Sequence, residues 1–137
     1  MRKNLRPEDL GDLLEQPLVA VLATYRRDGG VLLSPVWHRW RDGGFDVVTN
    51  RGGIKERHLQ HDPRASILVY EHEPPYRGIE VSGEARLESS GEAFREIAIR
   101  YLGEEEGKAY AEQVMDETLI RLEPGRVRAW DFADQFG

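Results

Sequence analysis

Cysteine is absent from the 137-residue chain, and its absence narrows the possible chemistry. Without thiols the chain has no disulfide framework, no thiolate nucleophile and no cysteine-ligated metal cluster. Long hydrophobic runs are missing too, since no apolar segment approaches the roughly 20 residues that span a bilayer. The start, Met-Arg-Lys-Asn-Leu-Arg-Pro-Glu-Asp, has no signal-peptide core. We therefore expect a cytoplasmic protein without a membrane partner.

The common signatures of enzyme active sites are absent as well. There is no Gly-x-Ser-x-Gly elbow, no Walker loop and no Gly-x-Gly-x-x-Gly fingerprint. Of the four histidines, His58 and His61 have the i, i+3 spacing of two metal ligands on one helix, but no third ligand has an evident spacing. The sequence therefore predicts no metal site, and no side chain is assigned as a catalytic acid or base.

Charge is unevenly distributed along the chain. The net charge is -6, yet residues 25–64 hold eight Lys or Arg against five Asp or Glu, a local balance of +3. The remainder carries eleven basic and twenty acidic residues, a balance of -9. A local basic zone on an acidic body suits a small anionic ligand, whereas nucleic acid requires a broad positive face. We expect no nucleic-acid partner.

The hydrophobic pattern predicts a mainly β (α+β) fold in a single domain, residues 1–137. Helices are expected at residues 7–14 and 105–114. A third should follow the Gly52-Gly53 turn and end at Asp62-Pro63, and a fourth should run from the capping box at 89–92 to Gly103. We expect six antiparallel strands, at residues 18–24, 31–40, 45–49, 65–70, 79–87 and 118–132. The last is bent at Pro124-Gly125. Together the strands would close into a small barrel with the helices outside.

Two of these strands have distinctive patterns. Residues 18–24 are almost continuously apolar, which is typical of a strand covered on both sides, whereas residues 79–87 alternate cleanly and predict one buried face. Pro35 interrupts the strand at residues 31–40 and cannot donate a ladder hydrogen bond. That strand is therefore either bulged, which would open backbone groups toward a ligand, or a plain edge strand.

The segment Val47 to Arg64 predicts an anion site. A strand leads through a glycine turn into a short basic helix, whose start exposes free N–H groups and the positive end of its dipole. Lys55 and Arg57 lie in or just after the first turn, so an anion would meet amides and cations together. The alternative is that both side chains belong to a solvated helix face.

An ordered set of short motifs resembles the pyridoxamine 5′-phosphate oxidase-like split-barrel family, within it the subgroup that uses flavin or the deazaflavin coenzyme F420. The likeness covers nearly the whole chain. The matching pieces are Leu22-Ala-Thr24 with Asp28-Gly29, Ser34-Pro-Val-Trp37, Val48-Thr-Asn50 with Lys55 and Asp62-Pro-Arg64, Val81-Ser-Gly83-Glu-Ala85, and Tyr101-Leu-Gly103. The resemblance implies a six-stranded antiparallel split β-barrel with flanking helices.

The resemblance also implies roles for individual residues. The strand that would lie along the cofactor's tricyclic ring holds Ser34, Pro35, Val36 and Trp37, and the positions that would take the ribityl phosphate are Val48, Thr49, Asn50, Arg51, Lys55 and Arg57. Family members form homodimers with the cofactor at the interface, so the resemblance implies that Tyr76, Gly78 and Trp130 reach the partner's cofactor.

One departure from the family narrows the function. The oxidase itself has a longer Arg- and Lys-rich signature and a tryptophan–arginine ending, whereas this chain closes Trp130-Asp-Phe-Ala-Asp-Gln-Phe-Gly137. We therefore expect no vitamin B6 oxidation. We expect an oxidoreductase that binds F420, or alternatively FMN, and transfers a hydride between the cofactor ring and a small unsaturated or heteroaromatic substrate. The other hypothesis is a flavin, deazaflavin or haem-related binding protein without turnover, a carrier or sensor.

Overall fold

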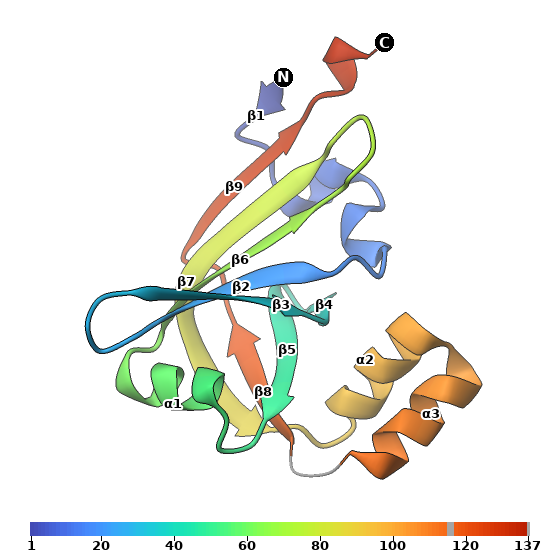
Figure 1. The fold of residues 1–137 in the computed structure, drawn as a ribbon. Helices are drawn as coiled ribbons and strands as arrows, with labels where there is room; N and C mark the ends of the chain where they lie inside the picture. The colour runs from blue at the N-terminus through green and yellow to red at the C-terminus, as the bar shows by residue number, and fades with distance from the viewer. Residues whose placement is uncertain (115–116, 137) are drawn as a thin grey trace.

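The computed structural model describes residues 1–114 and 117–136, and over this part of the chain it has nine strands and three α-helices (Figure 1). The strands are β1 (Arg2–Lys3), β2 (Ala20–Tyr25), β3 (Val31–Val36), β4 (His38–Arg41), β5 (Gly44–Asn50), β6 (Arg64–Tyr70), β7 (Gly78–Ser89), β8 (Glu117–Leu122) and β9 (Arg126–Asp131). The helices are α1 (Ile54–His61), α2 (Ala93–Leu102) and α3 (Glu104–Gln113), with 3₁₀ turns η1 (Pro7–Leu10), η2 (Leu13–Glu15) and η3 (Ala133–Gln135).

The strands form one curled antiparallel sheet in the order β3-β2-β6-β7-β8-β5-β4, with β9 pairing β7 and β1. The long strand β7 joins the two halves, because its first part pairs with β6 and β9 and its last part with β8. In Figure 1 helix α1 lies on one side of β5 and β8, and the α2–α3 pair lies on the other. This arrangement confirms the mainly β, antiparallel split-barrel fold with flanking helices.

The strand count differs from the expected six for identifiable reasons. The segment at residues 31–40 divides at Trp37 into β3, which pairs with β2, and β4, which pairs with β5. The last expected strand divides at Pro124-Gly125 into β8 and β9, which pair with different partners. The two-residue strand β1 adds the ninth.

Strand β3 decides between the two alternatives for Pro35. Its pairing with β2 runs without a slip from Ala20 opposite Val36 to Tyr25 opposite Val31, so the register contains no bulge. Strand β3 also ends the sheet order, where a residue without an N–H costs no ladder hydrogen bond. The edge-strand interpretation is confirmed and the bulge is wrong.

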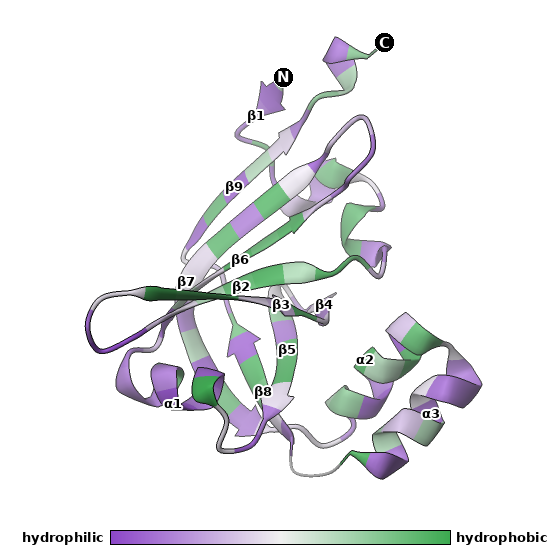
Figure 2. Cartoon of the chain, viewed as in Figure 1, coloured by the Kyte–Doolittle hydropathy of each residue, from purple (hydrophilic) through white to green (hydrophobic). Residues whose placement is uncertain are grey.

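The core lies inside the curled sheet. Strand β7 alternates as expected, with Ile79, Val81 and Ala85 buried. Strand β2 does not have the two-sided burial that its apolar sequence predicted: Leu22 is buried, whereas Val21 is only half-buried, so one face remains partly open. Figure 2 shows strongly hydrophobic colour on the neighbouring edge strand β3. A hydrophobic surface therefore lies on this side of the sheet.

The helix boundaries follow most of the sequence signals. Helix α1 begins after Gly53 and ends at Asp62, and Gly103 ends α2 with a φ of 91°. The expected capping box before α2 does not form, because the N-cap residue, Glu92, has a helical conformation and makes no side-chain cap. The first expected helix is two 3₁₀ turns, interrupted at Gly11, whose φ is 60°. No described helix is long and apolar enough to cross a membrane.

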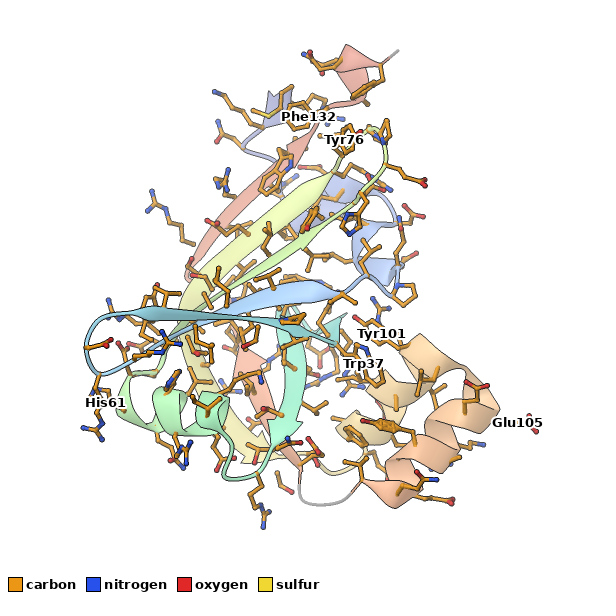
Figure 3. All side chains as sticks on the ribbon, in the orientation of Figure 1. Trp37, His61, Tyr76, Tyr101, Glu105 and Phe132 are labelled. Carbon is orange, nitrogen blue, oxygen red and sulfur yellow. The ribbon has the colours of Figure 1, made fainter. Side chains whose placement is uncertain are left out.

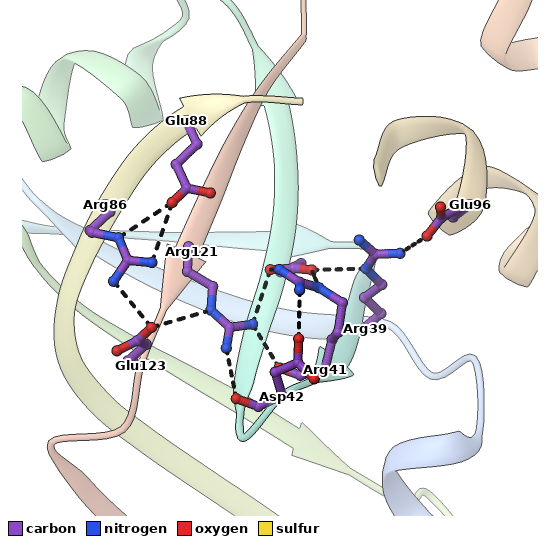
Figure 4. Close-up of polar contacts among 9 residues, drawn as sticks. Arg39, Arg41, Asp42, Arg86, Glu88, Glu96, Arg121 and Glu123 are labelled. Carbon is purple, nitrogen blue, oxygen red and sulfur yellow. Dashed lines mark hydrogen bonds and ion pairs between the residues drawn. The ribbon is translucent and has the colours of Figure 1, made fainter. Parts of the chain in front are cut away.

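A buried ion network fixes the β4–β5 hairpin to β8 (Figure 4). Asp46 has no solvent exposure and accepts hydrogen bonds from Arg39 Nε at 2.8 Å, Arg41 Nε at 2.7 Å and Arg121 Nη1 at 3.2 Å. Burial alone would raise the pKa of the Asp46 carboxyl, but hydrogen bonds from the three arginines outweigh it and hold the pKa below its usual value. Arg39 also contacts Glu96, which ties the network to α2.

Candidate functional site

Two clefts lie on either side of α1. The central cleft has a volume of about 390 Å³ and is lined by Val19, Pro35, Val36, Trp37, Val48, Asn50, Lys55, Phe94, Tyr110 and Glu117. The hairpin cleft has a volume of about 830 Å³ and is lined by Tyr25, Arg26, Arg27, Asp28, Ile54, Arg57, His58, Gln60 and His61. The central cleft brings together six residues that the sequence assigned to a cofactor: Pro35, Val36, Trp37, Val48, Asn50 and Lys55.

The aromatic wall of the central cleft is built where β3 passes into β4. Trp37 lies between the two strands and stacks on Tyr101 of α2, with ring centroids 5.0 Å apart and planes 8° from parallel. Tyr110 of α3 meets Trp37 edge-on at 5.8 Å. Figure 3 shows Trp37 and Tyr101 together between the sheet and α2. Both helices therefore fix the orientation of the indole.

Polar contacts hold Tyr101 and α2 in place. The Tyr101 hydroxyl donates to the carbonyl of Leu18 at 2.7 Å and accepts the backbone N–H of His38 at 3.0 Å. Arg100 donates to the carbonyl of His38 at 3.1 Å and to that of Gln16 at 2.6 Å. Because these bonds join α2 to β4 and to the segment before β2, the wall behind Trp37 is preorganised.

His38 is buried directly beneath this wall. Its ring has no solvent exposure and lies edge-on to Phe45 at 5.5 Å and to Tyr101 at 6.3 Å. Neither ring nitrogen has a hydrogen-bond partner among the described protein groups. Burial, with a smaller contribution from the positive charge of Arg100, lowers the pKa of His38 to about 4. His38 is therefore neutral at pH 7.

Side chains alternate between the two faces of a strand, so some residues assigned to the cofactor ring or phosphate do not line a cleft. Ser34 and Thr49 are buried and do not line either cleft, whereas Pro35 is exposed. Because the side chains of Ser34 and Thr49 are buried, only the backbone of these two residues is suited to contact a ligand in the central cleft. Arg51 is exposed in the turn before α1 and lines neither cleft.

Some of the backbone N–H groups just before α1 are hydrogen-bonded within the protein itself. The Glu56 carboxylate accepts the N–H of Gly52 at 3.2 Å and the hydroxyl of Thr118 at 2.6 Å, and Gly53 donates to the carbonyl of Asn50 at 3.0 Å. The first three N–H groups of the helix have no partner within it. Half-buried Lys55 forms no ion pair with any described residue. An anion in the central cleft would meet this ammonium.

Lys55 and Arg57 line different clefts. Residues two apart on a helix do not share a face, so Lys55 lines the central cleft and Arg57 the hairpin cleft. Arg57 is joined there by Arg26 and Arg27, and within the described chain none of the three takes part in an ion pair. With these three arginines against one carboxylate, Asp28, the hairpin cleft is a basic surface on an acidic protein.

The remaining assigned residues lie at the opposite end of the sheet. Gly78 lies opposite Trp130 in the β7–β9 register, and the indole covers Gly78 so closely that a Cβ there would clash. The Tyr76 ring lies 5.5 Å from that of Phe136. Figure 3 shows Tyr76 far from Trp37. Within one chain this group does not meet the central cleft.

Sequence reasoning missed Glu117 and the aromatic pair Phe94 and Tyr110. The Phe94 ring of α2 packs against Tyr110 of α3, with ring centroids 5.8 Å apart, and both rings line the cleft. Glu117 opens β8 and has no local motif; only the pairing of β8 with β5 brings it opposite Asn50. Among the described residues, no group of three or more side chains could hold a metal ion.

Comparisons with known proteins bear on the family and the fold. A family model described as pyridoxamine 5′-phosphate oxidase matches residues 7–131. A conserved hypothetical protein of Mycobacterium tuberculosis is similar at a TM-score of 0.82 and 25% identity, covering 97% of this chain and 89% of that one. An F420 reductase is similar at 0.73 and 25%, covering 89% and 98%.

A further solved structure bears on the fold alone. The haem storage protein HutZ of Vibrio cholerae is similar at a TM-score of 0.69 and 18% identity, with 91% of this chain and 94% of that one covered. No curated protein sequence matches the chain significantly.

Proposed function

The chain belongs to the pyridoxamine 5′-phosphate oxidase family, and from that premise we propose that it is an oxidoreductase that binds F420, with FMN as the alternative. It would transfer a hydride between the cofactor ring and a small unsaturated or heteroaromatic molecule. The central cleft carries the proposal, because Pro35 to Trp37, Val48 with Asn50, and Lys55 line one hollow of about 390 Å³. Small-molecule sites typically measure roughly 300–1,000 Å³.

The residues of the central cleft fit such a cofactor. The cleft has an apolar and aromatic wall around Trp37 and a single ammonium, Lys55, at the start of α1. An elongated molecule with a flat ring at one end and a phosphate at the other matches that division. Lys55 and the free amides of α1 would hold the phosphate, and the exposed edge of β3 around Pro35 would lie along the ring.

The protein's own contribution would be binding and orientation. When bound, the cofactor supplies hydride transfer. The stacked pair of Trp37 and Tyr101 would fix one boundary of the ring site and exclude water from it. His38 stays neutral beneath that wall and does not exchange protons near pH 7.

The hairpin cleft favours F420 over FMN. FMN ends at its phosphate, whereas F420 continues into an anionic tail. Arg26, Arg27 and Arg57 form no ion pair with described residues. They line the hairpin cleft, whereas Lys55, on the same helix as Arg57, lines the central cleft. A tail that passes from Lys55 around the helix would neutralise three charges that FMN would leave unpaired.

A double substitution separates the two cofactors. Arg26→Ala with Arg27→Ala should weaken F420 binding, by roughly 100-fold or more if each of the two lost charge-assisted bonds costs about 1.5–3 kcal/mol. FMN affinity should stay unchanged, and this makes FMN the matched control ligand. Micromolar binding of FMN by the wild type, without binding of F420, would show that the cofactor choice is wrong while leaving the fold intact.

A homodimer with the cofactor at the interface completes the proposal. On the open side of the sheet Leu33 is 65% exposed, Val19 51% and Val31 45%. Exposure of these apolar side chains to water is unfavourable. A two-fold axis would bury this face and build two equal sites. The distant group at Tyr76 and Trp130 could then reach a cofactor held by the other chain.

The enzyme and carrier hypotheses differ in one measurable step. Reduced F420 and the protein would be mixed with each member of a panel of unsaturated and heteroaromatic compounds, and oxidation of F420 would be followed by its absorbance. An oxidoreductase should give protein-dependent oxidation that saturates with at least one compound, and Lys55→Ala should need more F420 to reach the same rate. Tight binding of F420 with no substrate-dependent oxidation across the panel would favour the carrier or sensor.

A further inference from the structure

We propose that the side chain of Glu117 takes up a proton when a phosphate-bearing ligand binds in the central cleft, so that ligand binding and protonation are coupled. The inference rests on the proposed function, because it needs such a ligand next to Lys55. Strand pairing places Glu117 directly opposite Asn50, the residue that ends β5 just before the α1 turn. Glu117 therefore lines the same cleft as Asn50 and Lys55.

Glu117 is a buried carboxyl without a compensating charge. The residue is only 9% exposed. It takes part in no ion pair and no side-chain hydrogen bond with the described groups. Burial raises the pKa of its carboxyl. A carboxyl whose pKa burial has already raised responds to a further nearby charge, because a second anion raises that pKa again.

The charged neighbours of Glu117 do not supply a permanent partner. From α1 come Lys55 and Glu56, and the Glu56 carboxylate contacts Thr118, the next residue along β8. A second cleft of about 360 Å³, which Glu117 also lines, contains Glu92 and Arg95 near the start of α2 and Lys108 and Glu112 of α3.

The cations in that second cleft are already engaged. Arg95 lies 3.7 Å from Glu92 and Lys108 lies 2.6 Å from Glu104. Asp116 precedes Glu117 in the chain and lies outside the described residues. Lys55 is thus the one described cation lining the central cleft, and it would be shared between Glu117 and any bound anion.

A phosphate beside Lys55 would compete with an ionised Glu117 for that one cation. Two anions that share a partly desolvated site repel each other, and protonation of the weaker acid removes the repulsion. The carboxyl pKa would rise further in the complex than in the free protein. Between those two pKa values, affinity should fall about tenfold for each unit of rising pH; outside that interval Glu117 contributes no pH dependence.

Calorimetry in buffers of different ionisation enthalpy counts the protons taken up. The ligands are F420 and its ring compound without the phosphate, and the proteins are wild type, Glu117→Gln and the control Glu112→Gln. In a series from pH 5 to pH 8, at the pH of greatest uptake, we expect wild type and Glu112→Gln to take up more protons per F420 than Glu117→Gln does. The phosphate-free compound should abolish that difference. Glu117→Gln should also bind F420 more tightly at pH 8 and lose the pH dependence.

The carboxyl carbon shift of labelled Glu117 gives a second observation that does not depend on a variant folding. It should move toward the protonated value when F420 is added. Equal proton uptake by wild type and Glu117→Gln, or a shift that stays at the carboxylate value, overturns the coupling while the proposed function stands. If neither F420 nor FMN binds, the proposed function fails and the coupling fails with it.

Discussion

Replacing His38 by leucine should remove an acid sensitivity that the structure builds into the core. The imidazole has no solvent exposure, and the pKa of His38 is lowered from 6.5 to about 4 by burial and, to a smaller extent, by Arg100. In the unfolded chain this histidine becomes protonated below about pH 6.5, whereas in the folded chain it stays neutral until about pH 4. The unfolded state therefore binds more protons across this interval.

The size of the effect follows from the two pKa values. One pKa unit corresponds to about 1.4 kcal/mol, so the linkage removes roughly 3 kcal/mol of stability between pH 7 and pH 4. The loss begins as pH falls below the unfolded value and is complete below the folded value. Leucine has a similar volume and no titrating group, so it would keep the contacts with Phe45 and Tyr101 without the proton linkage.

Urea denaturation followed by circular dichroism at pH 7 and pH 4 measures the difference. Wild type should lose roughly 3 kcal/mol more than His38→Leu over this range. The exposed His72 provides the matched control, and His72→Leu should lose as much as wild type. Equal acid losses in wild type and His38→Leu would refute the assignment of a buried neutral imidazole.

Three further substitutions test the site, the core and the dimer. Lys55→Ala should lower F420 affinity roughly 10- to 100-fold, less at high salt, and unchanged affinity in a titration would mean that the phosphate lies elsewhere. Asp46→Asn should cost about 3–5 kcal/mol in urea unfolding, because buried Arg121 would lose its buried counter-charge and keep only the exposed Glu123 at 3.7 Å; a loss near zero would contradict a tight network. Trp130→Ala should weaken dimerisation and cofactor binding together, and sedimentation that finds a wild-type monomer with tightly bound cofactor would exclude the shared site.

Local signals predicted the elements around the site well. Gly52-Gly53 and Asp62-Pro63 set the limits of α1, because glycine turns and proline act on the backbone at the residues themselves. The alternation of β7 predicted its buried face for the same reason. These features require no knowledge of what lies opposite in the fold.

The errors of the sequence predictions concern which strands pair and which face of an element a side chain occupies. Nothing in the pattern at residues 31–40 shows that the chain changes partner strand at Trp37, and nothing near Glu117 shows that it comes to lie opposite Asn50. Both facts depend on strand pairing between distant segments. The separation of Lys55 from Arg57 was predictable, since residues two apart on a helix face different ways.

The central claim is that the cleft beside Trp37 holds a flavin-type cofactor, and equilibrium titration tests it most directly. F420 and FMN would each be added to the purified protein while tryptophan fluorescence is followed, with Trp37→Phe to identify the reporting side chain. The account predicts saturable binding of F420 in the micromolar range, one cofactor for each chain, with a fluorescence change that Trp37→Phe removes. Absence of saturable binding by either cofactor would contradict it.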